Sequence, residues 1–191
     1  MAEITMTPAT AREWNDLQAA LTGGGDGRTC QCAWVMMRSA EYRAASVDAR
    51  REALRRETEA PLPPGILAYR DGEPAGWVRV GPRTAHLRFE RTRVAAASPE
   101  PKDDPSVWVV SCFSIRSEHR RRGVSAALLD AAVAFAREHG ARVIEGYPLD
   151  NTQQKPSSNA LFVGALTTFL DAGFTELARP TETRRLVSLT L

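Results

Sequence analysis

The sequence lacks the features that mark a membrane-bound, secreted or strongly nucleic-acid-binding protein. No apolar run reaches the roughly 18 residues that a membrane-spanning helix needs. The first residues do not show the basic-then-apolar layout of a signal peptide. The net charge of +2 is too small to predict a polyanion as the partner. We therefore expect a cytoplasmic protein that has no membrane contact and no broad nucleic-acid-binding surface.

The sequence also lacks the usual signatures of metal and nucleotide sites. It contains neither Gly-x-Gly-x-x-Gly nor Gly-Lys-Ser/Thr, which argues against a dinucleotide site and a P-loop. Cysteines are few, and their odd number predicts free thiols rather than disulfides. Cys30 and Cys32 form a close pair, but tetrahedral zinc needs four ligands, and His86, His119 and His139 are scattered along the chain. We therefore expect no bound metal.

What is present indicates one domain of mixed α/β type. The chain has 191 residues, of which 43% are hydrophobic, enough for a substantial core. Residues 84–105 have no clear period and are expected to form a surface excursion, and residues 151–159 to form a loop. Hydrophobic spacing, caps and turn residues predict strands over 4–7, 65–69, 75–80, 107–115, 142–147, 175–178 and 186–191, and helices over 11–21, 46–59, 124–139 and 161–172.

The most informative passage is the basic loop between the strand 107–115 and the helix that begins near Gly123. The first N–H groups of a helix have no partner within the helix, and the helix dipole makes that end electropositive. An anion is therefore stabilised there. Gly123 has no Cβ to collide with a phosphate, Ser125 adds a hydroxyl, and arginines suit phosphate oxygens. The loop is thus a candidate phosphate site, although it could also be only a solvated basic turn.

Two motifs resemble those of a known family. The strand, then Arg120-x-x-Gly123-x-Ser125, then an apolar helix resemble the acetyl-CoA-binding segment of GNAT superfamily N-acetyltransferases, whose pattern is Gln/Arg-x-x-Gly-x-Gly/Ala. Ser125 in place of the last small residue is a mild departure. Ala172-Gly173-Phe174, which closes the last predicted helix, resembles the end of the family's final helix. The strand order agrees over nearly the whole chain.

The resemblance implies a GNAT-like α/β fold. Such a fold has a mixed central sheet of about six or seven strands, a splayed pair of parallel central strands and helices on both faces. The whole chain, 1–191, would be one acyltransferase domain. Its parts would be acceptor-side elements in 1–83, the surface excursion in 84–105, a CoA-binding core in 106–148, and the C-terminal helix and strands in 160–191.

The resemblance also implies acetyl-CoA as the cosubstrate. The strand 107–115 would carry a bulge and separate from the strand 142–147, and the pantetheine arm would pair with the backbone of that first strand in the opening. The pyrophosphate would lie on the N–H groups of residues 121–125. The implied cofactor-binding residues are Phe113, Ile115, Arg120, Arg121, Arg122, Gly123, Val124 and Ser125.

Acetyl transfer requires a base for the amine and benefits from an acid for the departing thiolate. In this family a tyrosine four residues before the closing glycine often serves as the acid, but this position is Phe169 here. Tyr147 is the substitute that the sequence offers, and a structural aromatic at a strand end is its alternative interpretation. Glu145, on the same face of the predicted strand, is the candidate base. An ion pair with an arginine is the alternative for Glu145.

Trp34 and Cys112 are the candidate acceptor-side residues. Trp34 belongs to the apolar stretch 30–37, which would line the acceptor pocket or the core. Cys112 lies on the strand that would face the thioester. A nucleophilic role for Cys112 lacks a histidine nearby in sequence, which favours a small buried side chain.

The sequence leaves the acceptor open. The expectation is direct acetyl transfer to a primary amine of a small molecule, by a monomer or homodimer. A protein amine or a charged tRNA is an alternative acceptor. A CoA-binding module without catalysis is the other alternative, which the phenylalanine at the usual tyrosine position makes plausible.

Overall fold

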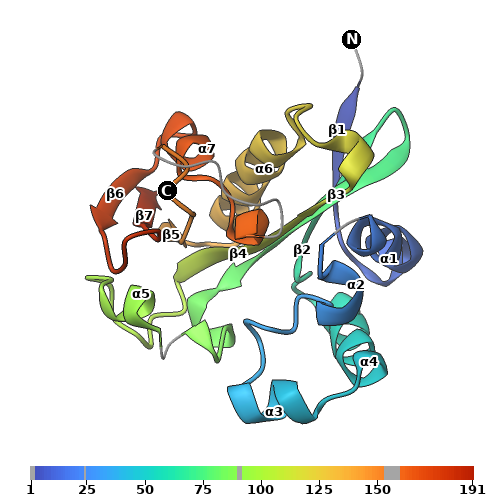
Figure 1. Cartoon of the computed structure of the whole chain (residues 1–191), viewed down its shortest axis with the longest axis horizontal. Helices are drawn as coiled ribbons and strands as arrows, with labels where there is room; N and C mark the ends of the chain where they lie inside the picture. Colours follow the sequence, from blue (N-terminus) through green and yellow to red (C-terminus); the bar gives the residue numbers. More distant parts are fainter. Residues whose placement is uncertain (1–2, 24, 90–91, 153–159) are drawn as a thin grey trace.

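The structure, a computed structural model, describes residues 3–23, 25–89, 92–152 and 160–191. Its strands form a seven-stranded sheet in the order β1-β2-β3-β4-β5-β7-β6 (Figure 1). Only β4 and β5 pair in parallel, and the other neighbours are antiparallel. The predicted mixed sheet is therefore confirmed. The strands are β1 (Ile4–Pro8), β2 (Gly65–Arg70), β3 (Glu73–Pro82), β4 (Val107–Ile115), β5 (Val143–Gly146), β6 (Thr175–Ala178) and β7 (Leu186–Thr190).

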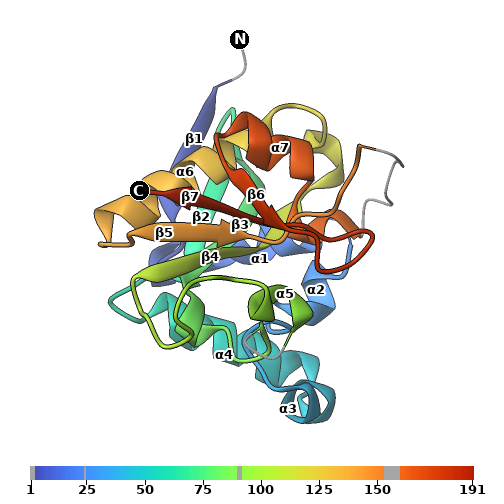
Figure 2. The same cartoon turned by 90° about the vertical axis from the view of Figure 1, so that its left-hand side faces the viewer.

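Helices cover both faces of the sheet, as predicted (Figure 2). The helix α6 (Val124–Glu138) packs on one face, where Leu128 and Leu129 join Val78 of β3 in the main core. The helix α1 (Trp14–Thr22) packs on the opposite face against Trp77. Neighbouring residues of a strand point to opposite faces, so Trp77 and Val78 serve separate cores. Among the helices described, none combines the length and apolar character needed to span a bilayer.

Local sequence signals explain the two helices of the N-terminal part. Thr10 and Glu13 form a capping box, in which each side chain satisfies a backbone N–H of the other, and the short helix η1 (Ala11–Glu13) leads into α1. The hydroxyl of Ser46 accepts a hydrogen bond from the N–H of Ala49 and caps α4 (Val47–Thr58). Both helices match their predicted ranges.

Three segments differ from the predictions. The short helices α2 (Gly27–Cys30) and α3 (Ser39–Ala44) were not predicted, because a helix of one or two turns leaves no apolar period in the sequence. The predicted helix 161–172 is broken into η5 (Ala160–Val163) and α7 (Leu166–Asp171), since Gly164 adopts a φ of +84° between them. Within the predicted loop 151–159, residues 153–159 lie outside the described residues.

The segment 84–105 is more than a surface excursion. It contains the end of η2 (Arg83–Ala85) and the helical turn α5 (Arg93–Ala96). Phe89 and Ala95 are buried there against Val109 of the sheet. The segment therefore packs on the sheet at Val109. Its helical turns are too short to produce a regular spacing of apolar residues in the sequence.

The centre of the sheet opens along β4, as the resemblance implied. Parallel pairing with β5 ends at Val110 and Gly146, so β4 continues alone on that side. On the other side Arg79 faces Cys112 while Val80 faces Val110, which leaves Ser111 as the extra residue of a β-bulge.

A buried histidine fixes this bulge. The Nδ1–H of His86 donates to the carbonyl of Pro82 at 3.0 Å, because a carbonyl can only accept. The Nε2 of His86 therefore accepts a hydrogen bond, also 3.0 Å long, from the hydroxyl of Ser111. Burial lowers the pKa of His86 to about 4, so the ring is neutral at physiological pH.

Candidate functional site

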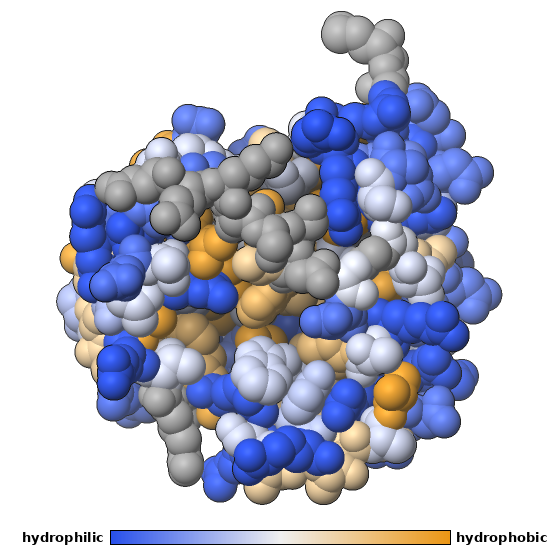
Figure 3. All heavy atoms as spheres, in the orientation of Figure 1, coloured by the Kyte–Doolittle hydropathy of each residue, from blue (hydrophilic) through white to orange (hydrophobic). Residues whose placement is uncertain are grey.

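A cavity of about 1410 Å³ opens where β4 leaves β5. Its walls come from the turn around α2, the second half of β4, the loop that leads into α6, and the segment from η5 to α7. Figure 3 shows a hollow near the middle of this face, with apolar residues inside and hydrophilic residues around the rim.

One end of the cavity has the features of an anion site. Arg120, Arg121 and Ser125 line it, next to the start of α6. The Nε of Arg120 donates to the carbonyl of Ile115 at 3.2 Å, which ties this side chain to the end of β4. Arg121 and Gly123 adopt φ values of +59° and +81°. These left-handed conformations turn the chain into the helix, so the free N–H groups of its first turn begin beside the arginines.

The predicted cofactor-binding residues fall into two groups. Phe113, Ile115, Arg120, Arg121 and Ser125 line the cavity together. The other three lie nearby but are not part of its lining: Val124 is buried in the main core, and Arg122 and Gly123 are exposed. A Cβ on Gly123 would meet no atom within 4 Å, so glycine is required by the positive φ rather than by crowding.

The middle of the cavity is the unpaired part of β4. Residues 111–115 have β3 on one side, and none of the described strands pairs with them on the other. Unpaired backbone N–H and C=O groups at a strand edge can bind an extended ligand as an added strand. The geometry therefore suits a long polar molecule that lies beside Phe113 and Ile115.

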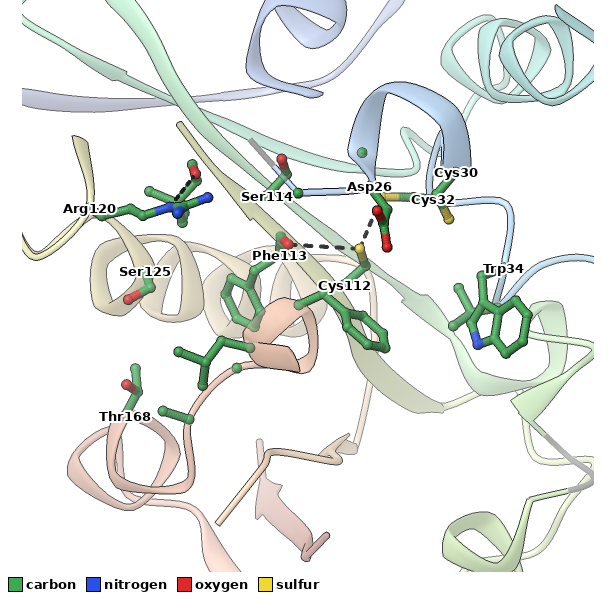
Figure 4. A pocket seen from close by; sticks show the side chains of 18 of the residues that line it. Asp26, Cys30, Cys32, Trp34, Cys112, Phe113, Ser114, Arg120, Ser125 and Thr168 are labelled. Atoms are coloured by element: carbon green, nitrogen blue, oxygen red, sulfur yellow. Dashed lines mark hydrogen bonds between the residues drawn. The ribbon is translucent and has the colours of Figure 1, made fainter. Parts of the chain in front are cut away.

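The rest of the cavity carries one acidic group and, at its far end, aromatic groups. Trp34 is 43% exposed and stands edge-on to Tyr42, with ring centroids 5.2 Å apart. The guanidinium of Arg88 lies 3.4 Å from the centroid of the Trp34 ring. Figure 4 shows Arg120 and Ser125 at one end, Trp34 at the other, and Asp26 and Cys112 between them. Among the described lining residues, Asp26 is the only carboxylate.

Glu145 and Tyr147, the predicted catalytic residues, do not line the cavity with the others. Glu145 is fully buried and forms an ion pair of 2.9 Å with Arg83. It also accepts hydrogen bonds from the hydroxyl of Ser98 and from that of Tyr147, the latter at 2.6 Å. Burial, and then the negative charge of Glu145, raise the pKa of Tyr147 well above its usual value. The structure thus contains the ion pair that was the alternative interpretation of Glu145.

Phe169, at the family's tyrosine position, is fully buried. It packs edge-on against Phe113 and Phe174. A Cβ on Gly146 or Gly164 would lie 2.3 or 2.6 Å from its ring, so these two glycines make room for it. This position is therefore part of the core rather than of the cavity lining.

Sequence reasoning missed several lining residues, among them Asp26, Thr168 and Arg184. Arg184 lies between β6 and β7, and its guanidinium is 5.5 Å from the centroid of the Phe162 ring. Burial lowers the pKa of Arg184. Asp26 and Arg184 occur in loops without a period or motif, so no sequence signal identifies them. Within the described residues, no three side chains of His, Cys, Asp or Glu come together in a way that could hold a metal ion.

Comparison with known families gives one match over most of the chain. The model of the acetyltransferase (GNAT) family matches residues 32–154, which is more than half of the sequence. No curated protein matches.

Several solved structures share the fold. PaiA N-acetyltransferase from Thermoplasma acidophilum, solved in complex with coenzyme A, is 11% identical, with a TM-score of 0.57 and 99% of both chains covered. YncA from Salmonella typhimurium, solved with its cofactor acetyl-CoA, is 15% identical, with a TM-score of 0.57, covering 98% of this chain and 94% of YncA. Ribosomal-protein-alanine N-acetyltransferase from Brucella melitensis is 16% identical, with a TM-score of 0.58, covering 98% of this chain and 99% of that protein.

Proposed function

The chain belongs to the acetyltransferase (GNAT) family, and on this premise we propose that it transfers an acetyl group from acetyl-CoA directly to a primary amine of a small molecule. The observation that carries the proposal is the continuity of the cavity. An anion-binding end, an unpaired strand edge and an acidic, aromatic end follow one another along a single opening.

The donor is expected to occupy the first two of these regions. The pyrophosphate lies at the start of α6, where Arg120 and Arg121 add positive charge to the free N–H groups. The pantetheine arm extends along the backbone of Phe113 and Ile115. The structures of PaiA with coenzyme A and of YncA with acetyl-CoA support this donor.

The acceptor amine is expected at the third region, beside Asp26. As the one described carboxylate in the lining, Asp26 attracts an ammonium group and can take the proton that the amine must lose. The amine then attacks the thioester carbonyl, the C–N bond forms, the C–S bond breaks, and the thiolate of CoA takes up a proton. A backbone N–H of the bulged strand stabilises the oxyanion.

This arrangement changes the proposed roles of Glu145 and Tyr147. Their hydrogen bonds to each other and to Arg83 favour a structural role, because the Glu145 carboxylate is fully buried among these partners and does not line the cavity. Glu145 as the base therefore remains a prediction that the cavity lining does not support.

A small molecule is the favoured acceptor because Trp34 and Tyr42 stand together at the far end of the cavity. The name of the Brucella melitensis relative describes an enzyme for a ribosomal-protein alanine. A protein or aminoacyl-tRNA amine is thus the second candidate acceptor, and it competes for the same end of the cavity.

Isotope transfer from labelled acetyl-CoA onto a panel of small amines, peptides and charged tRNA tests the proposal. We expect labelled small amines. In Asp26→Asn, kcat/KM for the amine falls by about a hundredfold, typical of a lost general base, while the Kd for CoA is unchanged. Asp130→Asn, which changes an exposed carboxylate on α6, is the matched control and keeps wild-type rates. CoA binding without transfer to any acceptor would instead identify a binding module.

A further inference from the structure

All three cysteines of the chain line the same cavity. Two of them meet there, although they are 80 residues apart in the sequence. The Sγ atoms of Cys32 and Cys112 lie 3.0 Å apart, which is within hydrogen-bonding contact (Figure 4). Cys32 follows α2 on the acceptor side of the cavity, and Cys112 follows the bulge of β4. The thiol pair thus joins the two walls of the cavity.

The backbone at Cys32 is held in an uncommon conformation. Gln31 and Cys32 have φ values of +52° and +49°, in the left-handed region that residues with a Cβ rarely adopt. The buried side chain of Gln31 anchors the turn, since it accepts a hydrogen bond from Gln18 at 2.9 Å and donates one to the carbonyl of Arg28 at 2.9 Å. Such strain persists only where the surroundings enforce it, and it is concentrated at functional positions. In this turn the backbone conformation places the sulfur of Cys32 next to that of Cys112.

The surroundings of the pair make the two sulfurs chemically different. The indole N–H of Trp77 donates to the sulfur of Cys32 at 3.1 Å, and the buried guanidinium of Arg79 adds positive charge. The hydrogen bond from Cys112, followed by these two groups, lowers the pKa of Cys32 despite its burial. Donating that hydrogen bond, together with burial, raises the pKa of Cys112 well above its usual value. Cys32 is therefore the more acidic thiol of the pair.

We propose that Cys32 and Cys112 are a peroxide-sensitive dithiol that closes to an intramolecular disulfide inside the cavity. The two sulfurs need to approach by only about 1 Å to reach the length of a disulfide bond. Hydrogen peroxide is small enough to enter a cavity of about 1410 Å³, so the burial of Cys32 does not exclude it.

The reaction balances in two steps. The thiolate of Cys32 attacks one oxygen of hydrogen peroxide, the O–O bond breaks, and Cys32 becomes a sulfenic acid while hydroxide leaves. The sulfur of Cys112 then attacks the sulfenic sulfur, the S–S bond forms, and the second hydroxide leaves with the thiol proton as water. The two sulfurs together lose two electrons, and the peroxide gains them.

The disulfide would tie the turn that carries Cys32 to β4, between the expected places of donor and acceptor. Oxidation is therefore expected to lower acetyl transfer several-fold, and dithiothreitol to restore it. This expectation alone rests on the proposed function. A chain that forms the disulfide but transfers no acetyl group would support the dithiol proposal and overturn only the proposed function.

Thiol counting on the full-length protein tests the site without any acetyl-transfer assay. After treatment with stoichiometric hydrogen peroxide, we expect the titratable thiols of the denatured chain to fall from three to one. Peptide mapping should show Cys32 linked to Cys112, and dithiothreitol should restore three thiols. In Cys30→Ser, the matched control for the third cysteine of the cavity, the same cross-link forms at an unchanged rate. In Cys112→Ser, a dimedone adduct appears on Cys32.

Three outcomes would contradict the proposed disulfide between Cys32 and Cys112. Three thiols that survive peroxide, a cross-link that includes Cys30, or disulfide-linked dimers in place of the intramolecular bond would each overturn the proposal. Because the wild-type chain alone gives the decisive map, a variant that fails to fold does not affect the test.

Discussion

Two sets of polar and charged side chains in this protein differ in how completely their charges are paired. We call the first set the sealed cluster; it consists of Arg83, Ser98, Glu145 and Tyr147, and its charges are buried and hydrogen-bonded to one another. The second set consists of Asp26 and Arg121 in the cavity, and neither side chain has an ion pair among the described residues.

The difference separates charges that serve the fold from charges available to a ligand. A buried charge without a partner is costly, so the sealed cluster must be complete in the folded chain. A charge at the edge of an open cavity stays hydrated until a ligand replaces the water. A carboxylate in a central strand is thus a poor indicator of catalysis when an arginine from a distant part of the chain reaches it.

Removing the carboxylate of the sealed cluster should have the largest effect. Glu145→Ala leaves the buried guanidinium of Arg83 without its counter-charge, and we expect the free energy of unfolding to fall by about 3–5 kcal/mol in urea denaturation. The matched control is Glu52→Ala, which breaks an exposed pair with Arg56 and should cost about 0.5 kcal/mol or less. Unchanged stability with loss of acetyl transfer would restore Glu145 as the base.

A pH change tests a second buried group, His86, whose ring is hydrogen-bonded to Pro82 and Ser111. The folded pKa of His86, about 4, lies below the value of about 6.5 expected in the unfolded chain. As the pH falls below 6.5, the unfolded chain therefore takes up the proton first. The contribution of neutral His86 is full above pH 6.5 and is lost towards pH 4, by up to about 3 kcal/mol.

Urea denaturation at several pH values between 7 and 4 measures this loss. His86→Gln should have a flatter profile than the wild type, because its side chain cannot titrate. His139→Gln, at the exposed C-terminal end of α6, should follow the wild-type profile. Parallel curves for all three proteins would mean that His86 titrates alike in the folded and unfolded states.

Two neighbouring arginines test whether a charge in the cavity lining contributes more to CoA binding than a charge outside it. Arg121 and Arg122 are both exposed, but only Arg121 lines the cavity. We expect Arg121→Ala to raise the Kd for CoA about tenfold, or about 1.4 kcal/mol, and Arg122→Ala to change it less than twofold. Isothermal titration calorimetry with CoA measures both. Equal losses would indicate a diffuse electrostatic attraction instead of a defined phosphate contact.

The smallest expected effect concerns Gly123. A side chain at its φ of +81° costs about 1 kcal/mol, so Gly123→Ala should lower the Tm by several degrees. Gly81→Ala is the control, because Gly81 has no positive φ and a Cβ there would meet only one atom of His86, at 3.9 Å. A larger fall for Gly81→Ala would contradict the backbone explanation.

The parts of the molecule that sequence could predict are those with local signals. The predicted helices 11–21 and 124–139 and the connection between the predicted strands 65–69 and 75–80 each depend on residues within a few positions. In the structure these are the capping box at Thr10, the start of α6 at Val124 and the turn at Asp71–Gly72. The placement of Arg120 and Ser125 beside β4 followed from a strand–loop–helix motif and its family resemblance.

The remaining features depend on contacts between distant parts of the chain. Arg83 and Glu145 are 62 residues apart, and Cys32 and Cys112 are 80 apart, so no pattern in one segment reveals either pair. Asp26 reaches the cavity from a loop whose path is set by the packing of α1 and α2. Sequence reasoning could name the basic end of the cavity, but not which carboxylate lines the same cavity.

The short parallel contact between β4 and β5 has a mechanical consequence. Four residue pairs, from Val107–Val143 to Val110–Gly146, are the only strand pairing between β1–β4 and β5–β7 among the described residues. The domain is thus two half-sheets whose backbones are joined by these four residue pairs. A molecule that lies in the opening beyond them contacts both half-sheets, and it therefore acts as a brace across the junction.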